Sequence, residues 1–147
     1  MASRSISDLH PQLAYAFGKA EAEWLLINPT APKPFLVATY RSSQEQQTLY
    51  DQPRDRKDND GDGLIDEKDE FVTNARAGQS PHNYFPSLAF DIAFRNSKGA
   101  TDYQVKWFAD FAKLVLKTPG ITWGGNFQSL IDRPHFELTG WEKLVKK

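Results

Sequence analysis

Residues 80–91 read SPHNYFPSLAFD, and residues 132–137 read DRPHFE. These two segments supply two imidazoles and one carboxylate, from His82, Asp91 and His135, with further carboxylates nearby. Two His and one Asp or Glu are typical of a catalytic Zn²⁺ site, which keeps a fourth position for water. We therefore predict that the two segments meet and bind one zinc ion. The alternative is that these are ordinary surface histidines or hydrogen-bonded core histidines.

The patterns around these residues favour strands that would bring them together. Residues 90–94 alternate apolar side chains with polar or small ones, as a half-buried strand does. A strand over 134–138 would place His135 and Glu137 on one side and Phe136 on the other. The carboxylate and the second histidine would then lie on neighbouring strands, and the first histidine would reach them from a loop.

Length and composition bound the kind of protein. A chain of 147 residues with an ordinary apolar content suits one globular domain over 1–147, and we expect a monomer. The formal net charge of −1 gives no argument for a nucleic-acid partner, and no apolar run is long enough for membrane insertion. The absence of Cys leaves only His and carboxylate ligands for zinc.

Helical spacing predicts a core-facing helix from about residue 8 to residue 27, capped by Ser7 or Asp8 and packed through positions that include Leu25. A second apolar stripe, which includes Tyr103, predicts a helix over about 102–117. Further strands are expected over 35–40 and 121–123, and a short helix over 141–147.

Arg41 follows the strand expected over 35–40 and precedes a short helix that Ser42 or Ser43 would cap. A cation at such a position is well placed to meet a substrate anion or a developing oxyanion. The alternative is an ordinary arginine in a salt bridge.

Residues 58–69, DNDGDGLIDEKD, follow the twelve-residue template of a calcium-binding loop. Gly63 stands at position six, where the sharp turn needs glycine, and position twelve is an aspartate rather than the usual bidentate glutamate. We predict an isolated EF-hand or dockerin-like loop inserted over 55–72; the alternative is an acidic solvated loop. The expected Ca²⁺ ligands are Asp58, Asp60, Asp62, the carbonyl of Leu64, Asp66 and Asp69.

Three motifs resemble those of the zinc peptidases of the D-Ala-D-Ala carboxypeptidase group, most closely the L-alanyl-D-glutamate peptidases that tailed phages use as endolysins. They are Tyr40-Arg41-Ser42 with Gln46 and Leu49-Tyr50; Ser80-x-His82 with Ala89-x-Asp91; and Trp123-Gly124-Gly125 with Asp132-x-x-His135-Phe136-Glu137. The loop between His82 and Asp91 is longer than in the family pattern, so it must bulge if both residues reach one metal. With the expected elements, the resemblance predicts an α+β fold, a small and mainly antiparallel sheet with flanking helices and a zinc cleft.

The resemblance also assigns roles to individual residues. It implies His82, Asp91 and His135 as the zinc ligands, Asp132 as the general base, and Arg41 as the cation that stabilises the tetrahedral intermediate. Ser80 and Gln46 are implied to contact substrate or to support the site. Glu137 is the rival base, for which we expect instead a role in orienting His135 or in binding substrate.

The function implied by the resemblance is zinc-dependent hydrolysis of the L-alanyl-D-glutamate bond of bacterial peptidoglycan during host lysis. From the calcium loop we further expect regulation, because calcium on residues 58–69 would order the segment that leads to Ser80 and His82. The enzyme would wait in the host cytoplasm and reach the periplasmic cell wall after holin-dependent release. The alternatives are a D,D-carboxypeptidase or dipeptidase, and a non-catalytic, calcium-dependent module that binds the wall.

Overall fold

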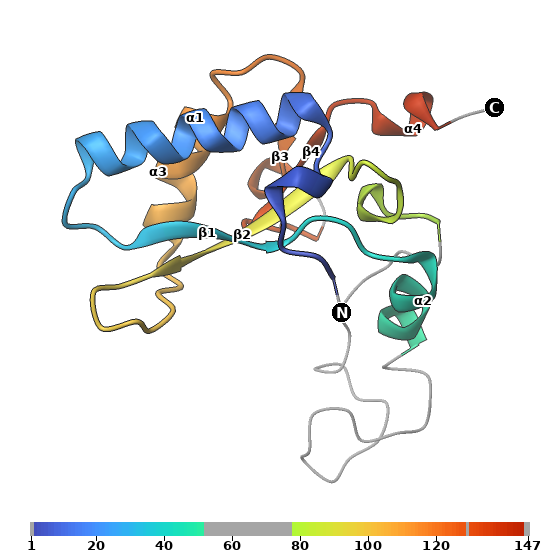
Figure 1. The fold of residues 1–147 in the computed structure, drawn as a ribbon, viewed down its shortest axis with the longest axis horizontal. Helices are drawn as coiled ribbons and strands as arrows, with labels where there is room; N and C mark the ends of the chain where they lie inside the picture. Colours follow the sequence, from blue (N-terminus) through green and yellow to red (C-terminus); the bar gives the residue numbers. More distant parts are fainter. Residues whose placement is uncertain (1, 52–77, 129, 146–147) are drawn as a thin grey trace, which may run out of the picture.

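The computed structural model describes residues 2–51, 78–128 and 130–145 (Figure 1). The calcium loop predicted over 55–72 lies outside these residues, as do its six expected ligands. None of the helices in the described ranges is long and apolar enough to cross a membrane.

The fold combines one sheet with surrounding helices, as the sequence predicts. The helices are α1 (Pro11–Ile27), α2 (Ser43–Asp51), α3 (Val105–Val115) and α4 (Trp141–Leu144), and short 3₁₀ helices cover Ile6–Asp8, Pro81–Asn83 and Gly124–Asn126. The strands are β1 (Lys33–Ala38), β2 (Ala89–Arg95), β3 (Ile121–Trp123) and β4 (His135–Leu138). They form a four-stranded sheet in the order β1-β2-β4-β3, in which every neighbouring pair is antiparallel. This confirms the α+β prediction.

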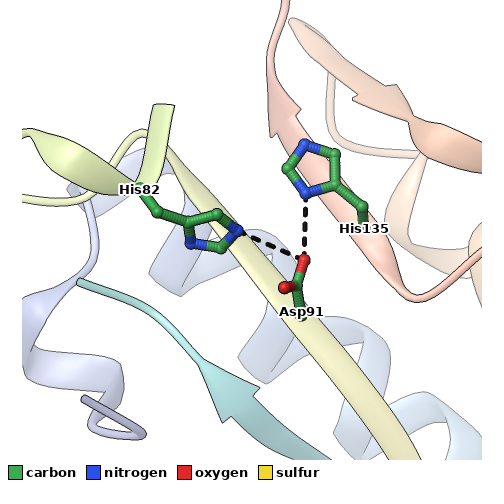
Figure 2. Close-up of side chains that lie close together, drawn as sticks. All are labelled: His82, Asp91 and His135. Carbon is green, nitrogen blue, oxygen red and sulfur yellow. Dashed lines mark hydrogen bonds and ion pairs between the residues drawn. The ribbon is translucent and has the colours of Figure 1, made fainter. Parts of the chain in front are cut away.

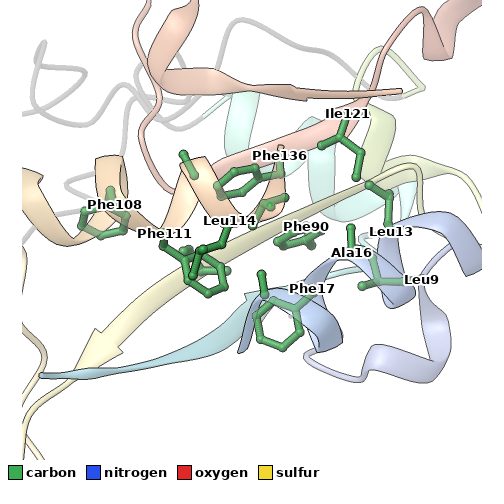
Figure 3. Packing of buried hydrophobic residues seen from close by; sticks show 14 of the residues in the cluster. Leu9, Leu13, Ala16, Phe17, Phe90, Phe108, Phe111, Leu114, Ile121 and Phe136 are labelled. Atoms are coloured by element: carbon green, nitrogen blue, oxygen red, sulfur yellow. The ribbon is translucent and has the colours of Figure 1, made fainter. Parts of the chain in front are cut away.

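The core lies between the sheet and the pair α1 and α3, which run along the same side of it (Figure 1). On β2, Phe90 and Phe94 face these helices. The Phe90 ring meets Phe17 of α1 edge-on, with centroids 5.5 Å apart, and the Phe94 ring meets Phe111 of α3 at 5.9 Å. Phe136 of β4 stacks on Phe90 with centroids 5.1 Å apart (Figure 3). Aromatic side chains therefore pack both central strands, β2 and β4, against the helices.

The register of the central strands decides what the opposite face carries. In the pairing of β2 with β4, Asp91 lies opposite His135 and Phe90 lies opposite Phe136. Since successive side chains of a strand point to opposite faces, the two aromatic rings enter the core and the two polar side chains leave it on the far face. Glu137 lies two residues beyond His135 on that face, as the alternation predicts.

Three details of the expected elements are wrong. The cap of α1 is His10, whose Nδ1 accepts a hydrogen bond from the Gln12 N–H at 3.2 Å, rather than Ser7 or Asp8. Leu25 faces solvent, because the buried stripe of α1 passes through Trp24 instead. Tyr103 lies before α3 and is 76 % exposed, so it is not part of the core stripe.

Candidate metal centre

Three side chains converge on the face of the sheet opposite the helices (Figure 2). Asp91 Oδ1 lies 3.3 Å from His82 Nε2 and 2.9 Å from His135 Nδ1. One ligand atom from each residue lies within 4.8 Å of the other two. The structure thus brings together the three residues that the sequence predicts as zinc ligands, from a loop, β2 and β4.

The loop that carries His82 is held by its own hydrogen bonds. Ser80 caps the 3₁₀ helix Pro81–Asn83, since its Oγ accepts from the His82 backbone N–H at 3.2 Å. The Asn83 amide donates to the Arg41 carbonyl at 2.9 Å, and the Arg41 N–H donates to the His82 carbonyl at 2.8 Å. Although this loop is longer than the family pattern, the imidazole still reaches the site. Ser80 is buried and engaged in this cap, and its contact with substrate stays a prediction.

Each imidazole has one nitrogen occupied by a protein acceptor and the other turned toward Asp91. His82 Nδ1–H donates to the Thr39 carbonyl at 2.7 Å, which leaves Nε2 facing the carboxylate. His135 Nε2–H donates to Glu137 Oε1 at 2.7 Å, which leaves Nδ1 facing it. Such outer contacts fix the ring orientation and the tautomer of metal-binding histidines. The geometry agrees with the orienting role expected of Glu137.

The electrostatics of the cluster are those of a cation site. Burial acts to raise the pKa of Asp91, but the charges of His82 and His135 and the hydrogen bonds from both hold it well below its usual range. Burial acts to lower the pKa of His135, but the hydrogen bonds to Asp91 and Glu137 raise it to about 10. In this arrangement a proton on His135 Nδ1 occupies the space between imidazole and carboxylate. Two imidazole nitrogens and one carboxylate oxygen are the donors that Zn²⁺ prefers, so the residues fit the metal.

Arg41 is positioned beside the cluster by a buried side chain. Its guanidinium donates to Gln46 Oε1 at 3.0 Å, and Gln46 of α2 is fully buried. Arg41 also lies close enough for its charge to lower the pKa of Asp132. Gln46 therefore orients the cation, and α2 is the element that carries this support.

Asp132 begins the turn that leads into β4. Its backbone N–H donates to the Gly124 carbonyl at 2.9 Å, and its carbonyl accepts from the His135 N–H at 3.1 Å. A Cβ at position 124 would collide with the Asp132 carbonyl, so only glycine allows this approach. The glycine at position 124 of the Trp-Gly-Gly segment thus allows the backbone contact that holds Asp132 beside the cluster.

The carboxyl of Asp132 interacts electrostatically with the expected metal ligands. Neighbouring atoms restrict its hydration, and the Asp91 charge lies nearby; both effects raise the pKa of Asp132 above its ordinary value. The charges of His135, His82 and Arg41 act in the opposite direction without cancelling the rise. Such a carboxyl is suited to accept and return a proton.

Two supporting groups were not predicted from sequence. The Thr39 carbonyl accepts both from His82 and from Ser87 Oγ, the latter at 2.8 Å, and the Trp123 Nε1–H donates to the Arg133 carbonyl at 2.7 Å. A backbone carbonyl carries no sequence signal, so Thr39 could not have been found. Trp123 stands in a quoted motif, which marked its importance but not its contact.

Comparison with known proteins relates the chain to peptidases of the bacterial cell wall. Residues 73–138 match the family described as D-alanyl-D-alanine carboxypeptidase. The chain is 32 % identical over 142 residues to the peptidoglycan L-alanyl-D-glutamate endopeptidase CwlK of Bacillus subtilis. The alignment covers 90 % of this chain and 74 % of CwlK.

Two solved structures share the fold. The Serratia marcescens L-Ala D-Glu endopeptidase ChiX matches with a TM-score of 0.61 and 18 % identity, over 97 % of this chain and 92 % of that one. The vancomycin-resistance D,D-pentapeptidase VanY, in complex with Zn(II), matches with a TM-score of 0.60 and 14 % identity, over 91 % of this chain and 74 % of that one.

The raised pKa of His135 makes the stability of the metal-free protein depend on pH. Because its pKa is 6.5 unfolded and about 10 folded, protonation stabilises the fold fully below pH 6.5, and this contribution is lost as the pH rises toward 10. We expect the melting temperature, measured in a chelator, to fall over this window. The variant His135→Gln should melt lower and show a flatter profile; a wild-type melting temperature that is constant or rises over the window would contradict the assignment.

Proposed function

Because this chain belongs to the D-alanyl-D-alanine carboxypeptidase family of metallopeptidases, we propose that it is a zinc-dependent endopeptidase that cleaves the L-alanyl-D-glutamate bond of peptidoglycan stem peptides. The observation that carries the proposal is the convergence of His82, Asp91 and His135, with one ligand atom of each turned inward. The choice of bond is supported by CwlK, whose name states this activity and which aligns with 90 % of the chain.

His82 Nε2, Asp91 Oδ1 and His135 Nδ1 would hold the zinc. When bound, zinc would lower the pKa of a water molecule to about 7 and polarise the scissile carbonyl. Glu137 keeps the His135 ring in place through its hydrogen bond to Nε2, and Thr39 does the same for His82. The protein thereby presents a ligand set of fixed orientation.

Asp132 is the residue that moves protons in this proposal. Its carboxylate takes a proton from the attacking water and returns it to the leaving amine of D-glutamate. Its raised pKa favours the first of these steps, since a more basic carboxylate accepts the proton and holds it until the bond breaks. Arg41, held by Gln46, would stabilise the negative charge that develops on the carbonyl oxygen.

Conservative variants separate the roles of the two carboxylates. Asp132→Asn should lower kcat by a hundredfold or more while zinc content stays at the wild-type level, because it removes the proton carrier but no ligand. Glu137→Gln should lower zinc affinity by roughly ten- to a hundredfold and keep activity once the metal is saturating. Kinetics on a defined stem peptide, with metal analysis of each sample, measures both effects.

Mass analysis of digested peptidoglycan identifies the bond. New amino groups on D-glutamate, paired with new L-alanine carboxyl ends, are the expected products. Release of terminal D-alanine would move the protein to the carboxypeptidases instead. Zinc-loaded protein that binds the wall without cutting it would favour the binding module.

We propose in addition that residues 58–69 bind Ca²⁺ and that this increases activity by ordering the chain that leads to Ser80 and His82. Support comes from the sequence, with oxygen-bearing side chains at loop positions one, three, five, nine and twelve and glycine at position six. Zinc-loaded protein should become more active as Ca²⁺ is added to calcium-free buffer. The double variant Asp60→Asn/Asp62→Asn should lose this response and retain basal activity. Equal wild-type activity with and without Ca²⁺, at constant zinc content, would refute the regulation.

A role as a phage endolysin, held in the host cytoplasm until a holin opens the membrane, is a further proposal that rests on the motifs. Cells of a Gram-negative host that express the protein should keep a constant optical density until the inner membrane is permeabilised, and should then lyse. Asp132→Asn should not lyse them. Lysis of wild-type-expressing cells before permeabilisation would contradict holin-dependent release.

A further inference from the structure

A pocket of about 260 Å³ opens beside Asp132, between the start of α3 and the turn that precedes β4. Its walls include one carboxylate, one cation and several apolar side chains, from Asp132, Arg133, Tyr103, Val105, Ile131 and Pro134. Since the Asp132 charge also interacts with those of the metal-ligand residues, the pocket and the cluster share this residue. None of the three expected zinc ligands lines the pocket, so Asp132 is the residue that links it to the candidate active site.

The pocket walls have the character of a binding surface. Tyr103, Ile131 and Val105 are 76 %, 54 % and 51 % exposed, and large apolar side chains gathered at one exposed place mark interaction sites more often than scattered ones do. The Arg133 side chain makes no hydrogen bond or ion pair with any residue in the described part of the chain, so its charge is free for a ligand.

The backbone of the turn is fixed even though the Arg133 side chain is free. The Arg133 carbonyl accepts from the Trp123 indole at 2.7 Å, and the Pro134 carbonyl accepts from the Ile92 N–H at 3.0 Å. Asp132, the residue before Arg133, donates its backbone N–H to the Gly124 carbonyl. Arg133 therefore projects from a turn whose backbone is fixed, one position after the proposed proton carrier in the chain and on the wall of the same pocket.

The chemistry of the proposed substrate matches this arrangement. In the stem peptide the chain continues through the γ-carboxyl of D-glutamate, so the α-carboxylate stays free. That carboxylate is attached to the same carbon as the amide nitrogen of the scissile bond. A residue that protonates this nitrogen must therefore lie close to the carboxylate, and a neighbouring guanidinium can bind it through two parallel hydrogen bonds.

We propose that Arg133 is a specificity-determining residue that binds the free α-carboxylate of D-glutamate, while the apolar walls of the pocket receive its methylene groups. The inference rests on the proposed endopeptidase function and extends it. An α-amidated stem peptide, which carries γ-D-isoglutamine, presents a neutral amide at this point and should be a poorer substrate. Arg41 does not make this distinction in the proposal, because it acts on the scissile carbonyl of either substrate.

The test compares hydrolysis of L-Ala-γ-D-Glu and L-Ala-γ-D-isoGln stem tripeptides by the zinc-loaded protein. We expect the wild type to have a kcat/KM about tenfold higher for the D-Glu tripeptide than for the D-isoGln tripeptide. The difference should lie in KM, because Arg133 would bind the carboxylate in the ground state and in the transition state alike. Arg133→Gln should abolish the preference by lowering kcat/KM for the D-Glu tripeptide alone, and Arg133→Lys should keep part of the preference. The matched control Arg95→Gln, an exposed arginine at the far end of β2, should behave as the wild type.

A binding measurement separates this inference from the reaction it rests on. The product dipeptide γ-D-Glu-L-Lys should bind about tenfold more tightly than its α-amide, and Arg133→Gln should abolish the difference. Cleavage of both tripeptides at equal rates, or an equal loss on both in Arg133→Gln, would overturn the role of Arg133 and leave the reaction standing. Selective dipeptide binding without cleavage of either tripeptide would support the role of Arg133 and overturn the reaction. Dipeptide binding that does not distinguish acid from amide would overturn the role of Arg133 in every case.

Discussion

The register between β2 and β4 is the constraint on which the rest of the structure depends. It sets Asp91 opposite His135 and Phe90 opposite Phe136. A slip of one residue would turn the aromatic rings toward the site and the polar side chains toward α1 and α3. The packing of the rings therefore holds the ligand geometry in place. The hydrophobic core and the candidate metal centre lie on opposite faces of the same pair of strands.

Much of this arrangement could be predicted from short patterns. The alternation in PHFEL separated His135 and Glu137 from Phe136, and the structure confirms it. Asp132 was predicted from its spacing to His135 within a resemblance, because an aspartate in a turn carries no periodic signal. The calcium loop was predicted from its ligand spacing alone and lies outside the described residues.

The errors have local physical causes. Tyr103 fits the helical stripe by spacing, but the Asp102 N–H donates to the Phe94 carbonyl at 2.8 Å, and this contact keeps the chain extended until Val105. His10 is not a common cap, yet its Nδ1 accepts the hydrogen bond that a serine would usually accept. In both cases a tertiary or side-chain contact overrode a local preference, which no pattern in the sequence records.

The order of the strands in the sheet affects how the protein folds. β4 inserts between β2 and β3, and Asp91 and His135 are 44 positions apart in the chain. Pairings of such separation form slowly, because closing the intervening chain costs entropy before the contacts form. The partners in the pairing of β1 with β2, such as Lys33 and Arg95, lie still further apart in the chain, whereas β3 and β4 pair across a short connection. A folding intermediate with only β3 and β4 paired would hold His135 alone and bind metal weakly. Pairing of β2 with β4 brings Asp91 to His135, so a bound ion and this long-range pairing would stabilise each other.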